Sequence, residues 1–297
     1  MTTDTLHKNT AANADDSDSG RAAPPIPVVI VGALGKMGLE TVAAINDAVN
    51  LELVARIDPA FVGNADADTY ASLDEFIAAD VLDPKTTRTV LIDFTRPDVV
   101  EANLTCALPL GFDCVVGTTG LSDVQLAALE SLIFEDRCLF IAPNFAIGAV
   151  LMMQLAQKVV PYMPQVEVIE YHHDNKLDAP SGTAKRTAEL LAEARAQALP
   201  DFVSTAPGAE TELLGCEGAR GGLVAVDGLE GVPVHSVRLP GYVAHQEVIF
   251  GGLGQTLTIR HDSIHRNSFM PGVVLACEEI GKHSGLVIGL ENFLNEE

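Results

Sequence analysis

The chain has 297 residues, 47% of them hydrophobic and 20% charged, which is a globular composition and long enough for two domains. Its 18 lysines and arginines face 41 aspartates and glutamates, and this net charge of −23 argues against nucleic acid or an anionic membrane surface as a partner. Five cysteines, an odd number without a C-x-x-C pair, argue against a disulfide framework and against a thiolate metal site. They predict a reducing, cytoplasmic location.

Neither the start of the chain nor its most apolar stretch has the features of a targeting or membrane segment. Residues 1–24 are polar, small and acidic, without the apolar core of a signal peptide or the arginine-rich face of a transit peptide, so we expect a disordered tail. The longest apolar stretch, Phe140–Ala156, is interrupted by proline, asparagine, glycine and glutamine. Polar groups at these positions would find no hydrogen-bond partner in lipid. We therefore expect no membrane-spanning helix.

The first half of the chain alternates short β-branched runs with longer helical patterns. The runs are continuously apolar, which is typical of strands buried on both faces of a parallel sheet. Strands are predicted over residues 27–31, 51–58, 89–95, 113–119 and 138–144, and helices over 37–48, 72–79, 97–108 and 122–135. This order predicts an α/β fold, a doubly wound parallel sheet of the Rossmann type, forming a dinucleotide-binding domain over residues 25–144.

After residue 144 the pattern changes to a second fold class. A helix is predicted over 147–160, then a strand over 165–173, a helix over 182–197, a glycine-rich stretch over about 200–231, and strands over 232–239, 245–252 and 255–262. Such adjacent strands predict an α+β domain with a mixed or antiparallel sheet over residues 145–262. A last helix is predicted over 269–283, within a C-terminal segment, 263–297, that we expect to return to the first domain.

A glycine-rich turn lies between the first predicted strand and the first predicted helix. Its G-x-x-G-x-x-G pattern allows a tight turn and lets backbone N–H groups approach a pyrophosphate at a helix N-terminus. Asp58 ends the second strand 20 residues beyond Gly38, where a carboxylate could bind an adenosine ribose. A turn that binds nothing is the alternative. The combined features favour a nucleotide site formed by Gly32, Ala33, Leu34, Gly35, Lys36, Met37 and Asp58.

Three further loops follow strand ends that should share the carboxyl edge of the same sheet. Ligands of open α/β sheets bind along that edge. Each loop taken singly could be ordinary turn chemistry. As a series they favour a groove for a nicotinamide cofactor, lined by Phe94, Thr95, Gly117, Thr118, Thr119, Ala142, Pro143, Asn144 and Phe145.

The most unusual segment is EYHHDNKLDAPSGTAK, residues 170–185. A histidine suits proton transfer near neutral pH, a lysine supplies positive charge or a proton, and N–H groups at a helix start can bind a carboxylate. These groups are His172, His173, Lys176, Gly182 and Thr183, and they point to an anionic substrate. The alternative is one buried and one solvated histidine beside a helix cap. No cysteine or acid at ligand spacing joins the histidine pair, so no metal is predicted.

From about Val28 to Leu294 the chain resembles the 4-hydroxy-tetrahydrodipicolinate reductase family, long called dihydrodipicolinate reductase. The resemblance rests on GALGKMG, IDFTRPD, VVGTTG, APNFAIGAV, EYHHDNKLDAPSGTA and the segment 258–271, and the histidine–lysine–PSGT signature is its most specific part. It implies an NADH- or NADPH-dependent oxidoreductase of lysine and diaminopimelate biosynthesis. The implied reaction is hydride transfer to a small cyclic dicarboxylate with loss of its 4-hydroxyl as water. The resemblance also implies a homotetramer built through the sheet of the second domain.

The resemblance implies roles for single residues. His172 is similar to the family's general acid/base, and Lys176 to the proton donor that works with it. His173, Gly182 and Thr183 resemble ligands of the substrate carboxylates, with Lys176 beside them. The glycine turn, the acid that ends the second strand and the three loops resemble the cofactor site.

The chain departs from the family pattern at three positions. Asn175 stands where many members have histidine, and Leu34 stands in the glycine turn where glycine or lysine is frequent. Neither change removes a catalytic group. Pro59 follows Asp58 instead of the arginine of members that favour a 2′-phosphate, so we expect NADH to be used as well as or better than NADPH.

A dianionic substrate must approach a chain of net charge −23, so the sequence also predicts a local basic pocket. Lys176, Lys185 and Arg186 are its candidate cations.

Two other classes of protein compete with this interpretation. A phosphorylating semialdehyde dehydrogenase needs an activated cysteine in its catalytic segment, but none of the five cysteines lies between residues 139 and 215. A nucleotide sensor could keep the glycine turn and lose the chemistry. The presence of His172, Lys176, Gly182 and Thr183 speaks against it.

Overall fold

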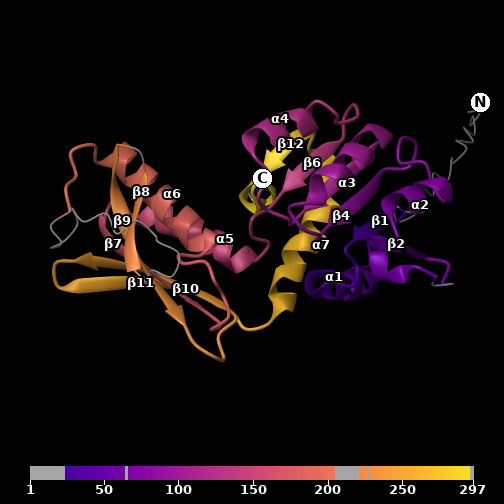
Figure 1. The fold of residues 1–297 in the computed structure, drawn as a ribbon. Coiled ribbons are helices and arrows are strands. Elements are labelled where there is room, and N and C mark those ends of the chain that lie inside the picture. Colours follow the sequence, from indigo (N-terminus) through magenta and orange to yellow (C-terminus); the bar gives the residue numbers. More distant parts are fainter. Residues whose placement is uncertain (1–23, 64–65, 205–220, 227, 295–297) are drawn as a thin grey trace, which may run out of the picture.

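A computed structural model describes residues 24–63, 66–204, 221–226 and 228–294, and these form two sheets with their helices (Figure 1). The predicted tail, residues 1–24, lies outside the described residues except for its last position. So does most of the glycine-rich stretch 200–231. The described residues contain no helix that is both long and apolar enough to cross a bilayer.

The first sheet has seven strands, all parallel, in the order β12-β6-β5-β4-β1-β2-β3. The strands are β1 (Ile26–Val31), β2 (Leu51–Ile57), β3 (Thr69–Tyr70), β4 (Thr89–Asp93), β5 (Phe112–Val116), β6 (Cys138–Ile141) and β12 (Gly285–Ile288). The strand order reverses between β1 and β4, and in such sheets ligands bind at the carboxyl ends of the strands near this reversal. The predicted Rossmann-type parallel sheet is confirmed.

Helices cover both faces of this sheet, which explains why its strands are continuously apolar. Val28 and Ile30 face the core formed with α1 (Lys36–Asp47) and α7 (Met270–Glu279). Val29 and Val31 face the opposite core. That core is completed by α2 (Leu73–Ala78), α3 (Val100–Ala107) and α4 (Asp123–Glu130).

The second sheet is mixed, in the order β11-β10-β7-β9-β8, with a parallel β7–β9 pair and antiparallel pairs elsewhere. Its strands are β7 (Gln165–His172), β8 (Gly221–Val226), β9 (Leu229–Arg238), β10 (Ala244–Gly252) and β11 (Gln255–Ser263). The helices α5 (Ile147–Val159) and α6 (Gly182–Ala198) lie on one face of it (Figure 1). The predicted α+β second domain is therefore confirmed as a fold.

The C-terminal segment lies against the first domain. The helix α7 packs beside α1, and β12 pairs in parallel with β6 at the edge of the first sheet (Figure 1). The helix predicted over 269–283 is shorter than expected, because a 3-10 turn, η4 (Ile280–Lys282), replaces its last part. The domain boundaries after residues 144 and 262 stay a prediction.

The observed strands differ from the prediction in two ways. The strands β3, β8 and β12 were not predicted, because a run of two residues, a run that begins with two glycines and a run of four residues are too short or too rich in glycine to give a strand pattern. The strands β5 and β6 end earlier than expected, at Val116 and Ile141, which pair with each other at the end of their ladder. The residues beyond them form loops at the carboxyl edge.

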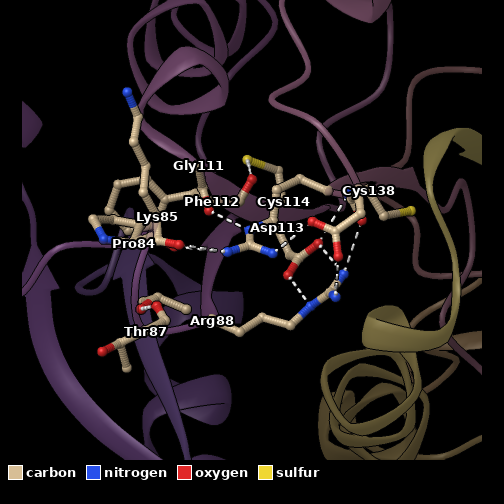
Figure 2. A network of polar contacts seen from close by, with 12 residues as sticks. Pro84, Lys85, Thr87, Arg88, Gly111, Phe112, Asp113, Cys114 and Cys138 are labelled. Atoms are coloured by element: carbon tan, nitrogen blue, oxygen red, sulfur yellow. Dashed lines mark hydrogen bonds and ion pairs between the residues drawn. The ribbon is translucent and has the colours of Figure 1, made fainter.

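The amino edge of the first sheet is held by a buried polar network (Figure 2). Asp113 is fully buried and accepts hydrogen bonds from Arg88 at 2.7 and 2.9 Å and from the backbone N–H of Cys138 at 2.8 Å. Burial raises the pKa of Asp113, and Arg88 opposes that shift. Arg137 donates to the carbonyl oxygens of Gly111 and Pro84 at 2.8 and 2.9 Å. The network joins β4, β5 and β6 at the end remote from the ligand-binding edge.

Candidate active site

The glycine turn and the end of β2 are joined directly. The Asp58 carboxylate accepts hydrogen bonds from the backbone N–H groups of Leu34 at 3.1 Å and Ala60 at 3.0 Å. Gly32 has φ of +83°, and a Cβ on Gly38 would lie only 2.1 Å from the Gly32 carbonyl oxygen. Both glycines are therefore needed for the close approach of α1 to the turn. The turn, the helix start and the carboxylate fit the ribose and pyrophosphate of a dinucleotide.

Asp93, at the end of β4, joins two of the three carboxyl-edge loops. Its buried carboxylate accepts hydrogen bonds from the Thr95 backbone N–H at 2.9 Å, the Thr95 hydroxyl at 2.6 Å and the Thr118 hydroxyl at 3.1 Å. Asn103 of α3 donates to its other oxygen at 2.8 Å. Four donors on one carboxylate hold the loops after β4 and β5 together.

Aromatic packing brings in the third loop. The rings of Phe94 and Phe145 meet edge to face with centroids 5.7 Å apart. A Cβ on Gly117 would lie 2.0 Å from the Phe94 ring, so this position admits only glycine without movement. The structure thus brings the three predicted loops together at one edge of the sheet.

A cavity of about 950 Å³ lies between the two domains. Residues from the loops after β5 and β6 line one side, and residues from α5, the end of β7 and the start of α6 line the other. The Asn144 side chain bridges the two sides by donating to the Thr183 hydroxyl at 3.2 Å. Among the predicted site residues, the lining includes Thr119, Pro143, Asn144, His172, Lys176, Gly182 and Thr183.

Other predicted site residues lie outside the lining of this cavity. They are the glycine turn from Gly32 to Met37, Asp58, Phe94, Thr95, Gly117, Thr118, Ala142, Phe145 and His173. Of the three cations predicted to form a basic pocket, Lys176 and Arg186 line the cavity and Lys185 does not. The cationic groups of the cavity therefore come from the loop after β7 and from the second turn of α6.

His172 is the last residue of β7, and a buried carboxylate contacts its ring. Its Nδ1 makes a short hydrogen bond with the carboxylate of Glu170, which is completely buried. The other Glu170 oxygen accepts from Arg238 at 2.8 Å and from the Ser181 backbone N–H at 3.3 Å. Burial alone would raise the pKa of Glu170, but hydrogen bonds from His172, Arg238 and Ser236 outweigh it and lower that pKa to about 2. Glu170 is therefore an ionised acceptor at neutral pH.

Lys176 lies on the loop that follows β7, and Nζ contacts the Asp178 carboxylate at 2.7 Å. Burial raises the pKa of Asp178, but the contact with Lys176 more than compensates and the pKa is lowered overall. The cavity lining therefore contains an ion pair, and a substrate carboxylate could contact its ammonium group.

The start of α6 offers backbone donors to the same cavity. Ser181 caps the helix by accepting a hydrogen bond from the Ala184 N–H at 3.3 Å, which leaves the N–H groups of Gly182 and Thr183 in the first turn. A Cβ on Gly182 would meet no atom within 4 Å, so the space beside this helix start is open. Such a helix start is a natural site for a carboxylate. In the part of the chain that the structure describes, no group of three or more metal-binding side chains is found.

Comparison with known proteins matches both halves of the chain to one family. The N-terminal model of dihydrodipicolinate reductase matches residues 26–145, and the C-terminal model matches residues 148–294. The chain belongs to the dihydrodipicolinate reductase family. This makes it an oxidoreductase with a Rossmann-like NAD-binding domain, a pyridine-nucleotide-dependent reductase of lysine and diaminopimelate biosynthesis.

Close relatives extend over nearly the whole chain. The 4-hydroxy-tetrahydrodipicolinate reductase of Desulfitobacterium hafniense is 46% identical over 91% of this chain and 98% of its own length. That of Lysinibacillus sphaericus is 47% identical over 91% and 99%. The dipicolinate-bound dihydrodipicolinate reductase from Paenisporosarcina sp. TG-14 is 41% identical, covers 90% of this chain and 99% of its own, and superimposes with a TM-score of 0.72.

In this dihydrodipicolinate reductase family member, three side chains that hold the site together were not among the predicted site residues: Asp93, Glu170 and Arg238. Glu170 lies two residues before His172, so the alternation of a strand places both on one face. That spacing was a usable signal. Asp93 and Arg238 carry no such signal, because their partners, Thr118 and Glu170, lie 25 and 68 residues away in the chain.

Proposed function

We propose that this chain reduces 4-hydroxy-tetrahydrodipicolinate to tetrahydrodipicolinate with NADH or NADPH, with the 4-hydroxyl lost as water. The observation that carries the proposal is the cavity itself, where His172, Lys176 and the start of α6 face loops of the nucleotide domain. The names of the relatives support this substrate. The dipicolinate bound by the solved relative is a ring dicarboxylate and supports the same substrate class.

The cofactor site runs along the carboxyl edge of the first sheet. The glycine turn and the start of α1 would hold the pyrophosphate, and Asp58 the adenosine ribose. The loops containing Thr95, Thr118 and Asn144 would lead the nicotinamide end toward the cavity. When bound, the cofactor supplies a hydride to a carbon of the substrate ring.

The substrate would bind through its two carboxylates. One contacts the N–H groups of Gly182 and Thr183 at the start of α6, and Lys176 neutralises the other. We also assign a carboxylate contact to His173, which rests on the resemblance alone. A cyclic dianion held at both ends would present one face of its ring toward the loop that contains Asn144.

His172 and Lys176 are the proposed proton donors. Reduction of a ring carbon leaves electron density that must be protonated, and departure of a hydroxyl as water also requires a proton. His172 has Nδ1 engaged by Glu170, which leaves Nε2 as its exchangeable position. Lys176 lies in the same cavity, where its Nζ contacts the Asp178 carboxylate at 2.7 Å.

The test is steady-state oxidation of NADH and of NADPH by the chain with freshly prepared substrate. We expect His172→Ala and Lys176→Ala to lose about 10² to 10⁴ in kcat and to keep NADH binding, because both residues lie in the second domain. Lys158→Ala, an exposed lysine on α5, serves as the matched control. Near-normal kcat in both cavity variants would contradict the assigned roles, and absence of wild-type turnover would contradict the function.

A cytoplasmic location is also proposed. Four described cysteines are free thiols, at positions 106, 114, 138 and 277. Burial raises the pKa of Cys138 to about 12, so its thiol stays protonated and unreactive. Free, buried thiols are typical of proteins in a reducing compartment.

A further inference from the structure

A buried ion pair lies directly behind the proposed proton donor. Glu170 on β7 and Arg238 on β9 are 2.8 Å apart, with side chains that are 0% and 4% exposed. The two strands run parallel, and Arg238 pairs in register with His172. The pair therefore belongs to the same end of the sheet as the catalytic histidine, with no other strand between them.

The chemistry of Glu170 determines which nitrogen of His172 carries a proton. An ionised carboxylate can only accept, so the short contact to Nδ1 requires an N–H at that nitrogen. In the neutral imidazole this leaves Nε2 as the unprotonated atom. Nε2 is then the position that takes up and releases the catalytic proton.

Arg238 contacts both Glu170 and the loop that follows β7. The same Nη2 that contacts Glu170 also donates to the Asp178 carbonyl oxygen at 2.6 Å, and Nη1 donates to the Val237 carbonyl oxygen at 2.9 Å. Asp178 in turn holds Lys176 through its carboxylate. One guanidinium thus connects the support of the histidine to the loop that carries the lysine.

We propose that Glu170 and Arg238 are positioning residues that set both proton donors. Glu170 fixes the Nδ1–H tautomer of His172, and Arg238 holds Glu170 and the loop of Lys176 in one geometry. The catalytic consequence rests on the proposed function. The tautomer does not, since it is a property of the resting protein.

A purely structural role is the competing explanation. Buried ion pairs can often be replaced by apolar side chains of similar volume without loss of stability, whereas removing one partner leaves an unpaired charge. The double variant Glu170→Met/Arg238→Met removes both charges together. If a single variant does not fold, this double variant still allows the proposal to be tested.

The first measurement is the ¹⁵N spectrum of the His172 ring in the whole protein without ligands. We expect Nδ1–H in the wild type and Nε2–H in Glu170→Gln, because the Gln carbonyl would stay on Arg238 and its NH₂ would face Nδ1. The signal is assigned by its loss in His172→Ala. An Nε2–H tautomer in the wild type, or an unchanged tautomer in Glu170→Gln, would overturn the proposal.

The second measurement is turnover. We expect kcat to fall about a hundredfold in Glu170→Gln and in the Met/Met variant, with the KM for NADH changed less than about twofold. Arg238→Lys should lose part of kcat, because a lysine cannot reach Glu170 and the Asp178 carbonyl from one planar group. Full kcat in the Met/Met variant would show that the pair is only structural.

The matched control is Asp113→Asn in the first domain. Asp113 is an equally buried carboxylate that is held by an arginine, Arg88, but it lies at the amino edge of the sheet (Figure 2). We expect this variant to lose stability and to keep both the wild-type tautomer of His172 and wild-type kcat. Equal losses of kcat in Asp113→Asn and Glu170→Gln would overturn the proposal. A wild type without turnover would instead contradict the proposed function, and the tautomer of His172 could still be tested.

Discussion

At the scale of single residues, the choice between NADH and NADPH depends on the charge around Asp58. This carboxylate suits the ribose hydroxyls and repels a 2′-phosphate unless a cation offsets it. The nearest arginine along the strand is Arg56. Its Nε and Nη2 donate to the two carboxylate oxygens of Asp68 at 2.7 and 2.8 Å. Pro59 occupies the position after Asp58 and provides no charge. Lys36, in the glycine turn, would contact the pyrophosphate.

We therefore predict that NADH is used as well as or better than NADPH. The measurement is kcat/KM for both cofactors at one salt concentration. A preference for NADPH above roughly tenfold, about 1.4 kcal/mol, would show that another cation governs the site. Asp58→Ala should weaken NADH more than NADPH, because it removes an acceptor for the ribose hydroxyls and a repulsion of the phosphate.

The residues that could be predicted from sequence are those with local signals. The glycine turn, His172 and Lys176 lie in short motifs whose chemistry can be interpreted within a few positions. Arg238 could not be found, because its function comes from the register between β7 and β9, and no local pattern encodes that register. Lys185 is the opposite case, a residue that was predicted at the cavity and is not part of its lining. Its side chain leaves the helix on another face.

At the scale of elements, an aromatic contact joins the carboxyl-edge loops in addition to the hydrogen bonds of Asp93. Phe94 fills the space above Gly117 and reaches Phe145 in the next loop. Glycine at position 117 is required by this approach, since a Cβ there would lie 2.0 Å from the ring. The aromatic contact therefore links the loops after β4, β5 and β6.

We predict that Gly117→Ala displaces Phe94, destabilises the fold by about 1–3 kcal/mol and weakens NADH binding. Urea unfolding and NADH fluorescence titration measure the two effects. Gly182→Ala is the control for stability, because a Cβ there meets no atom within 4 Å and alanine is the better helix former. Equal stability of the two variants would contradict the role of the aromatic contact.

The elements that sequence analysis missed are short or rich in glycine. The strand β12 has four residues, of which the first is the positive-φ Gly285, and its stability comes from pairing with β6 rather than from its own pattern. The strand β8 begins with two glycines and pairs with β9. Long apolar strands such as β1 and β4 were predictable because burial on both faces imposes a continuous pattern.

At the scale of the whole molecule, acid stability should report on the buried pair. A carboxyl whose pKa is lower in the folded state stabilises the fold above its unfolded pKa and loses this contribution as the pH falls. For Glu170 the window runs from about 4.5 down to about 2. The pKa of Asp113 is shifted upward, so its contribution has the opposite sign and weakens the fold as pH rises above 3.8.

We predict that the wild type loses stability relative to Glu170→Met/Arg238→Met when the pH is lowered from about 6 to about 3. Urea unfolding at several pH values measures the free-energy difference between the two proteins. Comparing them removes the contribution of Asp113 and of the surface carboxylates, which both proteins share. A difference that is independent of pH would show that Glu170 is not held ionised in the folded state.

We expect the five-stranded sheet to provide the surface for assembly. The helices α5 and α6 cover the face that carries Val168 and Val248, and the other face carries Ile169 and Ile249 with no helix packed against it among the described residues. The charges on this open face are paired within it. Arg260 lies 2.9 Å from Asp262 and also contacts Glu247, and the Glu167 carboxylate lies 2.8 Å from the His235 ring. A partner sheet could therefore cover the face without burying an unpaired charge.

We predict a homotetramer held by this open face, as the family resemblance implies. Light scattering after size exclusion should give four times the chain mass of 31.4 kDa. Ile249→Glu places a charge in the middle of the face and should dissociate the assembly while the α5–α6 side keeps the domain folded. Val124→Glu, an equally drastic change at an exposed position on α4, should leave the tetramer intact. A monomeric wild type, or a tetramer that survives Ile249→Glu and not Val124→Glu, would place the interface elsewhere.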